Sequence, residues 1–453
     1  MEETIVLYST PEHLNSLTCL ALFIAKHHPS ISVVVLSTAA PPIPAASSVT
    51  FLRLPSPDLP AKFTPIELFF ETSRLNNPNF RQALAQISLK SNIRAVVLDF
   101  FCNYAFEICE SLSIPVYFCN TTGASALCAL IYWPQFHDKT DGKLGGSVEI
   151  PGCPVIPESD LPEMLHFPQS LSYKHLMDTA KNIEKSAGVV VNTLYALEVR
   201  ALEALRNNLC TTPIYAIGPL IGVRIRNDAV DECLRWLDSQ PSKSVIFLCF
   251  GRRGAFSGEQ SREIAIGLEN SGYRFVWVLR SSGSESEDLE SVLPEGFVER
   301  MGERGRVLKS WAPQKAVLSH SSVGGFVTHC GQSSVLEAVS FGVPMIGWPL
   351  YAEQRMNRVF MVEEMKVAVA VELGPEGFVT AGEVEERVRE LMESRRGEEI
   401  GRRVAELRAA AAAAVGEGGS SVVALDEFIN AAVARVERAR ELHENNKGLG
   451  VFA

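Results

Sequence analysis

Several chemical signatures are absent from this 453-residue chain, and each absence argues against one class of function. The 10 cysteines are scattered, with no Cys-x-x-Cys pair and no cluster of Cys and His at zinc spacing. Neither a disulfide scaffold nor a zinc site is therefore expected. The chain also has no Gly-x-Gly-x-x-Gly fingerprint and no Asp-x-Asp motif. We expect no dinucleotide cofactor and no bound metal ion.

Basic charge and long apolar runs are also scarce. The 42 Lys and Arg residues are outnumbered by 53 Asp and Glu, which gives a formal net charge of −11. A chain this acidic offers no basic surface for nucleic acid or for an anionic membrane. No apolar run approaches transmembrane length, and the acidic opening Met1-Glu2-Glu3 is unlike a signal peptide. These features predict a cytoplasmic protein whose cysteines are reduced and buried.

The residues that are present predict an α/β protein of two domains. Hydrophobic residues make up 46% of the chain and charged residues 21%, as in a globular protein, and the length is too great for one compact core. Apolar runs of strand length, such as Thr4–Tyr8, alternate with patterns of helical period. Gly218-Pro219 interrupts this order near the middle of the chain. We expect a first domain over residues 1–220 and a second over residues 221–429.

One stretch of the second half carries more chemistry than any other. It opens with Trp311 and Gln314, an indole ring and an amide, which suit stacking on a planar base and pairing with its edge. Glu337 follows as a carboxylate that could bond a ribose hydroxyl. The stretch closes on Glu353-Gln354, an acceptor and an amide suited to sugar hydroxyls. Read in order, these residues predict a site for a nucleotide sugar.

The pattern between these residues predicts a strand, a turn and a helix. Val323–Val327 has the length and apolar character of a buried parallel strand. Gly331 then permits a tight turn, and Ser333-Ser334 are typical helix-capping residues. A helix that begins just past the carboxyl end of a strand offers free N–H groups and the positive end of its dipole. Such a helix start suits a pyrophosphate.

The same stretch resembles the plant secondary-product glycosyltransferase box, the UDP-sugar signature of family 1 glycosyltransferases. The resemblance implies a GT-B fold, in which two Rossmann-like domains face each other across a cleft. The acceptor would bind the first domain and the UDP-sugar the second, and a last helix over about residues 430–453 would pack back on the first. The residues that it assigns to UDP are Trp311, Ala312, Gln314, His329, Gly331, Ser333, Ser334 and Glu337.

Two residues of the first half have the chemistry of a general base and its partner. His13 follows the run Thr4–Tyr8, and Asp99 follows the run Arg94–Leu98, so both should lie at the sheet edge where ligands bind. A neutral imidazole can take the proton of a hydroxyl, and a carboxylate on its far nitrogen stabilises the imidazolium. The alternatives are a helix-start residue for His13 and a helix cap for Asp99. The resemblance favours the catalytic pair, although Glu12 stands where the family usually has Gly.

Further positions concern the transferred sugar. By the resemblance, a hydroxyl of Thr121 or Thr122 reaches it, and Glu353 and Gln354 hold its hydroxyls. Gln332 stands where the family usually has Trp, which opens space beside the sugar and offers an amide to a carboxylate. Arg252-Arg253 stand where the family usually has a small polar residue, and a guanidinium binds a carboxylate with two hydrogen bonds.

The chain as a whole is similar to plant flavonoid 7-O-glucuronosyltransferases. This resemblance implies an inverting, metal-independent enzyme that moves glucuronic acid from UDP-glucuronate to a phenolic hydroxyl. A monomer is our default expectation. The alternative is a UDP-glucose enzyme, in which Gln354 governs the donor, Gln332 is neutral and the arginines bind phosphate. Two other classes remain open on the same frame. A sugar-nucleotide isomerase or hydrolase would not need the His13–Asp99 pair, and an inactive UDP-sugar sensor would not depend on His13.

Overall fold

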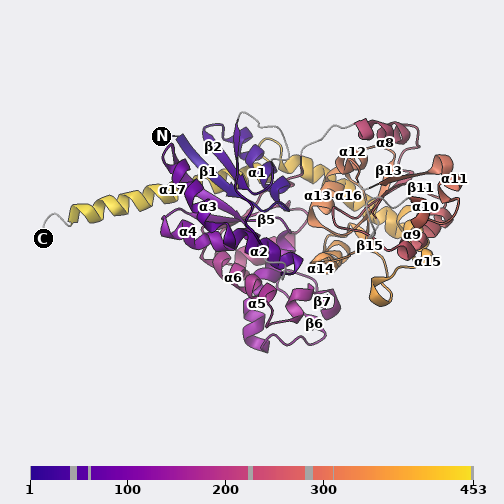
Figure 1. Cartoon of the computed structure of the whole chain (residues 1–453), viewed down its shortest axis with the longest axis horizontal. Helices are drawn as coiled ribbons and strands as arrows, with labels where there is room; N and C mark the ends of the chain where they lie inside the picture. Colours follow the sequence, from indigo (N-terminus) through magenta and orange to yellow (C-terminus); the bar gives the residue numbers. More distant parts are fainter. Residues whose placement is uncertain are drawn as a thin grey trace. The chain divides into compact units, whose positions relative to one another are not determined.

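The computed structural model shows two compact α/β units (Figure 1). The described residues are 2–40, 48–59, 63–222, 228–280, 289–309 and 311–449. Unit 1 comprises Met1–Val155, Glu163–Val223 and Ala413–Ala453, and unit 2 comprises Ile156–Pro162 and Arg224–Ala412. Each unit has its own parallel sheet, so the predicted α/β class is confirmed.

Unit 1 is built on seven parallel strands in the order β3-β2-β1-β4-β5-β8-β9. Parallel strands need long crossover connections, and the helices between them provide these. The strands are β1 (Glu2–Tyr8), β2 (Ile31–Ser37), β3 (Val49–Arg53), β4 (Ser91–Asp99), β5 (Val116–Asn120), β8 (Gly188–Val191) and β9 (Ile214–Ala216). The helices are α1 (Leu14–His27), α2 (Pro65–Leu75), α3 (Asn77–Ser88), α4 (Phe106–Ser111), α5 (Ala124–Thr140), α6 (Leu171–Lys185), α7 (Val199–Ala204) and α17 (Ser420–Leu449).

Unit 2 is built on six parallel strands in the order β12-β11-β10-β13-β14-β15. They are β10 (Val245–Cys249), β11 (Arg274–Leu279), β12 (Gly305–Lys309), β13 (Val323–Thr328), β14 (Met345–Gly347) and β15 (Ala368–Ala370). The helices are α8 (Asp228–Asp238), α9 (Gly258–Ser271), α10 (Leu289–Val292), α11 (Phe297–Met301), α12 (Gln314–Leu318), α13 (Gln332–Phe341), α14 (Gln354–Val359), α15 (Ala381–Glu393) and α16 (Arg395–Ala414). Two short strands, β6 (Ser147–Val148) and β7 (Ile156–Pro157), lie outside both large sheets.

The core of unit 1 explains why the first helix and the last helix dock on its sheet. On α1, Leu17, Leu20 and Ile24 recur at helical spacing and are fully buried. On α17, Phe428 packs edge-on against Tyr117 with ring centroids 4.8 Å apart. The last helix therefore belongs to unit 1. It begins at Ser420, earlier than the expected start near residue 430, and the expected residues 450–453 lie outside the described part of the chain.

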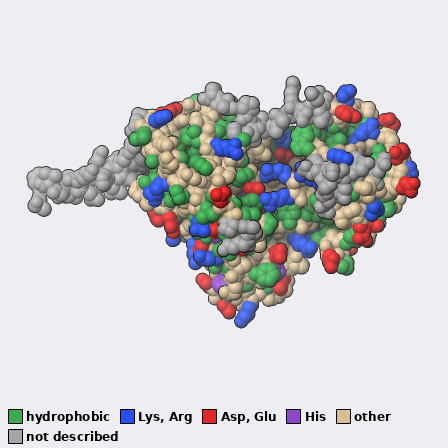
Figure 2. Space-filling view, viewed as in Figure 1, with side chains coloured by type: hydrophobic (Ala, Val, Ile, Leu, Met, Phe, Trp, Pro, Cys, Tyr) green, Lys and Arg blue, Asp and Glu red, His purple; other side chains and the backbone are tan. Residues whose placement is uncertain are grey.

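Charge of both signs occurs over the surface. Figure 2 shows acidic and basic side chains on the same face of the molecule, with hydrophobic atoms between them. The longest described helix, α17, has 30 residues. Within the described ranges, no helix combines the length and the apolar character that crossing a membrane requires.

Candidate active site

The candidate base and its partner meet at one edge of the unit 1 sheet. His13 directly precedes α1, and Asp99 ends β4. Because β1 and β4 are parallel neighbours with Tyr8 opposite Leu98, both residues reach the same edge. His13 Nδ1 lies 2.8 Å from Asp99 Oδ1, with the His13 side chain 19% exposed and Asp99 fully buried. The carboxylate can hold Nδ1–H, which leaves Nε2 as a base for an incoming hydroxyl.

Three further donors keep the Asp99 carboxylate in one orientation. The Thr10 N–H donates to Oδ2 over 3.1 Å, and the Thr10 hydroxyl donates to the same oxygen. The Phe101 N–H donates to Oδ1 over 3.4 Å. The Phe101 ring also stacks on the His13 imidazole, with centroids 5.1 Å apart. The sequence did not single out Thr10, because a hydroxyl residue shortly after the first strand is the only indication of its role.

The loop expected to contact the transferred sugar follows β5. Asn120 ends that strand, and its Nδ2 donates to the Gly123 carbonyl oxygen over 2.7 Å. The Thr122 hydroxyl donates to Asn120 Oδ1 over 3.0 Å, whereas Thr121 is buried. Because its hydrogen is already used, the Thr122 hydroxyl is left to accept a bond from a ligand.

Gln314 and Glu337, predicted to hold the base and the ribose, lie together in unit 2 with Ser334, predicted to contact the phosphates. Gln314, the first residue of α12, donates from Nε2 to Glu337 Oε2 over 2.8 Å and to Ser334 Oγ over 3.0 Å, both on α13. Burial raises the pKa of the Glu337 carboxyl, and the bond from Gln314 opposes this shift. Trp311, nearby in the sequence, is 43% exposed, so its indole ring is accessible to a planar base.

The turn between β13 and α13 has the features expected of a phosphate site. Cys330 adopts a left-handed conformation with φ +65°, and Asn357 Nδ2 donates to its carbonyl oxygen over 3.0 Å. Gly331 precedes α13 and supplies no side-chain cap. The Ser334 N–H donates to the Gly331 carbonyl oxygen over 2.9 Å, but Gly331 offers no side-chain acceptor to the N–H groups of Gln332 and the exposed Ser333. Ala312 is buried beside the candidate base site.

The imidazole of His329 is enclosed by two glycines. A Cβ atom on Gly251 would lie 2.7 Å from His329 Nε2, and one on Gly331 would lie 2.5 Å from it. Gly251 also has φ +74°, which favours glycine. The parallel pairing of Cys249 with Thr328 brings these two turns to one sheet edge. Burial lowers the pKa of His329 to about 4, and its Nδ1 bonds to no residue that the structure describes.

The buried His329 should make the stability of the unliganded protein depend on pH. The unfolded histidine has a pKa of about 6.5, so between about pH 6.5 and 4 the unfolded state binds more protons than the folded state. Stability should therefore fall as pH falls through that window, by up to about 1.4 kcal/mol per pH unit from this residue. Urea unfolding from pH 7 to 4.5 measures it. His329→Gln should give a shallower slope, and an unchanged slope would contradict this assignment.

Three residues of unit 2 predicted to contact the sugar differ in their burial and in their hydrogen bonds. Gln354 begins α14 and is buried, and its Oε1 accepts from the N–H groups of Leu350 and Tyr351 over 2.9 and 3.0 Å. Gln332 begins α13, and its Nε2 is buried without a hydrogen-bond partner among the described residues. Glu353 is half-buried.

The predicted arginine pair lies in the turn after β10. Arg252 and Arg253 are both exposed and directly follow Gly251. The guanidinium of Arg280 donates from Nη1 to the Arg252 carbonyl oxygen over 2.6 Å. This bond ties the backbone of the turn to the residue that follows β11. Sequence reasoning did not single out Arg280.

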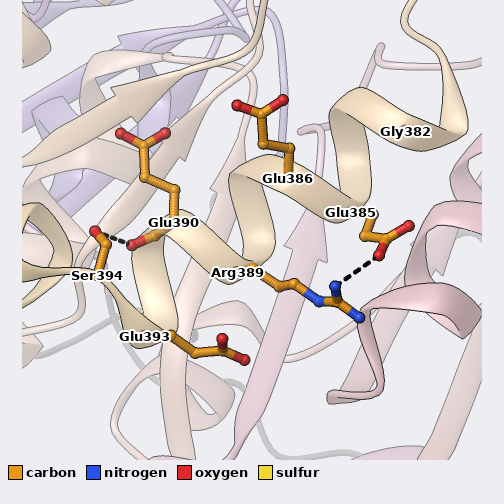
Figure 3. Close-up of a pocket in the computed structure, with 7 residues that line it drawn as sticks. All are labelled: Gly382, Glu385, Glu386, Arg389, Glu390, Glu393 and Ser394. Carbon is orange, nitrogen blue, oxygen red and sulfur yellow. Dashed lines mark hydrogen bonds and ion pairs between the residues drawn. The ribbon is translucent and has the colours of Figure 1, made fainter.

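A hollow on α15 is separate from these residues in sequence and in chemistry. Its lining, drawn in Figure 3, is Gly382, Glu385, Glu386, Arg389, Glu390, Glu393 and Ser394. Arg389 pairs with Glu385 over 2.9 Å across one helical turn. Glu386 and Glu393 are exposed, whereas Glu385 and Glu390 are half-buried and paired with arginines. Such a charged helix face is typical of a protein surface, and none of the predicted site residues belongs to this hollow.

The potential metal ligands of the chain are dispersed. In the ranges that the structure describes, no three His, Cys, Asp or Glu side chains are grouped as a metal ion would require. None of the ten cysteines forms a disulfide, and all of them are buried. Burial raises the pKa of several of them, including Cys330 to about 12, so these thiols are poor metal ligands and poor nucleophiles.

The chain is similar to known proteins in its sequence and in its structure. Residues 219–402 match the model of the family described as UDP-glucoronosyl and UDP-glucosyl transferase. Baicalein 7-O-glucuronosyltransferase of Scutellaria baicalensis is 49% identical, over 91% of this chain and 99% of that protein. Anthocyanidin 5,3-O-glucosyltransferase of a Rosa hybrid cultivar is 43% identical, over 93% and 97%. A Phytolacca americana UGT solved with UDP-2fluoro-glucose and pterostilbene has a TM-score of 0.85 and 34% identity, over 95% of this chain and 99% of that one.

These matches extend over both units, well beyond the stretch that suggested the family. The structural likeness confirms the predicted GT-B fold, since the solved relatives share it over almost the whole chain. The resemblance found in the sequence is confirmed as well. The chain is therefore a glycosyltransferase and belongs to the plant family 1 UDP-glycosyltransferases.

Proposed function

We propose that this enzyme transfers glucuronic acid from UDP-glucuronate to the 7-hydroxyl of a flavonoid and yields a β-O-glucuronide. We further propose a cytoplasmic monomer that needs no metal ion and binds neither nucleic acid nor membrane. The relatives support the class of acceptor, because one acts on baicalein and another on an anthocyanidin. The solved relative in complex with pterostilbene adds a third phenolic compound.

In this proposal His13 Nε2 takes the proton of the acceptor hydroxyl, and Asp99 stabilises the resulting imidazolium through Nδ1. The phenolate oxygen attacks the anomeric carbon from the face opposite UDP. The bond from that carbon to the phosphate oxygen breaks, UDP leaves with the electron pair, and the configuration inverts from α to β. The uncapped start of α13 and the neutral His329 would stabilise the charge that develops on UDP.

The proposal about the donor rests on which atoms of the Gln332 and Gln354 side-chain amides are available to a ligand. Gln332 Nε2 is buried and unpaired within the described part of the chain, and an unpaired buried donor costs about 1–3 kcal/mol. Gln354 Oε1 is committed to two backbone N–H groups, so Nε2 is the atom that can serve a ligand. Two amide donors favour a ligand rich in acceptors. A carboxylate fits, since it accepts through two oxygens and donates nothing, whereas the hydroxymethyl group of glucose carries one hydroxyl.

Charge near the site supports the same donor. The exposed guanidinium groups of Arg252 and Arg253 follow the glycine that packs against His329, and such groups bind carboxylates with paired hydrogen bonds. The second candidate is a UDP-glucose enzyme with the same acceptors. The anthocyanidin glucosyltransferase relative favours it, as does Gln354, which ends the box as in glucose users.

We expect Gln332→Trp to shift the donor preference toward UDP-glucose. The kcat/KM ratio of glucuronate to glucose should fall by roughly 10- to 100-fold, because a hydrogen bond to a charged group contributes about 1.5–3 kcal/mol. The assay offers a flavone with a free 7-hydroxyl equal amounts of both donors and weighs the products by mass spectrometry. It is run in EDTA, since the proposed mechanism uses no metal.

Two controls isolate the sugar contact. Inhibition by UDP, which has no sugar, should be unchanged in Gln332→Trp, and Ile266→Trp adds an indole at an exposed position of α9 without altering the ratio. Arg252→Ser should weaken use of UDP-glucuronate. A wild-type enzyme that forms chiefly glucoside would overturn the proposed donor, and one that glycosylates no flavone with either donor would overturn the proposed acceptor.

A further inference from the structure

A buried carboxylate in unit 1 has been given no role so far. Glu198 is 1% exposed and precedes α7. Its Oε2 accepts from the Ala124 N–H over 2.9 Å, and its Oε1 accepts from the Ser125 N–H over 2.8 Å. The buried Thr193 hydroxyl donates to Oε2 over 2.5 Å. Both oxygens of Glu198 are therefore used, and they hold the first two residues of α5.

This arrangement replaces the cap that α5 lacks. Gly123 precedes the helix with φ +87° and supplies no side-chain cap. A carboxylate at a helix start satisfies orphan N–H groups and interacts favourably with the helix dipole. The acceptor comes from 73 and 74 residues further along the chain, so it ties the segment after β8 to the helix that follows β5.

The residues fixed by this contact adjoin the loop of Thr121 and Thr122. Asn120 Nδ2 donates across that loop to the Gly123 carbonyl oxygen, and Asn120 Oδ1 accepts a hydrogen bond from the Thr122 hydroxyl. The Asn192 N–H donates to the Asn120 carbonyl oxygen over 2.9 Å. The loop is thus held at its start by β5 and β8 and at its end by Glu198, and movement of α5 would displace both threonine hydroxyls.

The corresponding helix start in unit 2 is arranged in a different way. α13 also follows a parallel strand and a glycine, and like α5 it has neither a side-chain cap from that glycine nor an acidic residue in its first turn. That start suits an anion. In unit 1 the equivalent position is already filled by the protein's own carboxylate, so we assign α5 to holding the loop and not to binding phosphate.

We propose that Glu198 is a positioning residue, which places the Thr121–Thr122 loop for contact with the donor sugar during transfer. This inference rests on the proposed function, because it takes the sugar contact of these threonines from it. Displacement of a contacting group by about 1 Å can lower a rate by roughly 100-fold. Loss of Glu198 should therefore appear in kcat, while binding of UDP through unit 2 is unaffected.

The primary variant is Glu198→Gln, which leaves one oxygen and turns a donor toward the helix start. We expect kcat to fall by roughly 10- to 100-fold, with the inhibition constant of UDP unchanged. The control is Glu67→Ala, which removes the side-chain acceptor of the Thr64–Glu67 capping box at the start of α2 in the same unit. The control should lower the melting temperature and keep kcat. The proposal would be overturned if Glu198→Gln lowered the melting temperature as much as the control does and left kcat unchanged.

A double-mutant cycle separates positioning from general damage. If Glu198 acts through the loop, Glu198→Gln should have little effect on kcat in a Thr121→Val/Thr122→Val background. Full additivity would overturn the proposal. If Glu198→Gln fails to fold, Thr193→Val decides, because it removes only one donor to Oε2. A few-fold fall in kcat at constant melting temperature supports positioning, and an unchanged kcat contradicts it.

The donor in these assays is whichever UDP-sugar the wild-type enzyme transfers. An enzyme that prefers UDP-glucose would therefore contradict the proposed donor without affecting this test. Conversely, an additive cycle in an enzyme that transfers glucuronic acid would contradict the role of Glu198 alone.

Discussion

Replacing His13 with Ala should lower kcat by roughly 100- to 10,000-fold, the range that general bases contribute. The imidazole has its Nδ1 held 2.8 Å from a fully buried carboxylate, so Nε2 is fixed as the atom that receives the proton. A phenolic hydroxyl is a poor nucleophile until that proton is removed. The KM for UDP-sugar should change little, because the residues predicted to bind UDP all belong to unit 2. Steady-state kinetics with saturating donor and acceptor measures the effect.

The chain offers a matched control for this variant. His28 also bonds a carboxylate over 2.8 Å, from Nε2 to Asp426 Oδ1, but it follows the far end of α1. His28→Ala removes an equivalent contact from the same unit and should leave kcat unchanged. If His13→Ala and His28→Ala had the same small effect, His13 would be a structural residue and the base would have to be sought elsewhere.

The proximity of His13 and Asp99 could be predicted from the sequence for a specific reason. Apolar runs of strand length are readable, and the residues that follow parallel strands meet at one sheet edge. His13 and Asp99 are 86 residues apart, yet adjacent strands bring them to bonding distance. The sequence assigns Gln314 and Glu337 to the base and the ribose of one nucleotide site, and the structure brings Gln314 Nε2 to 2.8 Å from Glu337 Oε2. Their roles remain proposals, whereas their proximity is observed.

Other features depend on packing that no local pattern expresses. Glu198 reads in sequence as an ordinary acidic residue before a helix, and only the fold shows that its carboxylate serves a different helix. Thr10 is likewise distinguished only by its bonds to Asp99. Strands of three residues, such as β14 and β9, carry too little periodicity to be predicted. Which amide atom of Gln332 and of Gln354 is available to a ligand could also not be predicted from the sequence, because an amide can present either its oxygen or its nitrogen.

The start of the last helix shows how little a local pattern says about the extent of an element. The resemblance implies a last helix over about residues 430–453. The structure begins α17 at Ser420, directly after the glycines 418 and 419, and buries Leu425 fully in the core of unit 1. Burial of an apolar face stabilises helical residues beyond what their propensity predicts. The structure thus assigns the whole described helix, from Ser420 on, to unit 1.

Glu337→Ala should weaken donor binding as strongly as any single change in unit 2. Its carboxylate is bonded to Gln314 Nε2 over 2.8 Å, and we propose that it also accepts the ribose hydroxyls. Hydrogen bonds to a charged acceptor contribute about 1.5–3 kcal/mol each, so the Kd of UDP should rise by roughly 10- to 100-fold. Isothermal titration calorimetry with UDP measures this directly. Glu363→Ala, which removes an exposed carboxylate on the same unit, should leave the Kd unchanged.

The same residue should make donor binding sensitive to mild acid. Burial raises the pKa of Glu337, so its carboxylate begins to take up a proton at a higher pH than an exposed glutamate. The protonated form loses acceptor capacity, and the KM for UDP-sugar should therefore rise as pH falls toward this raised pKa. A Glu337→Gln enzyme carries no titrating group at that position, so its KM should be higher at neutral pH and flatter with pH. If the wild-type and Glu337→Gln profiles were parallel, the ribose would be held by other groups, and the role proposed for Glu337 would be wrong.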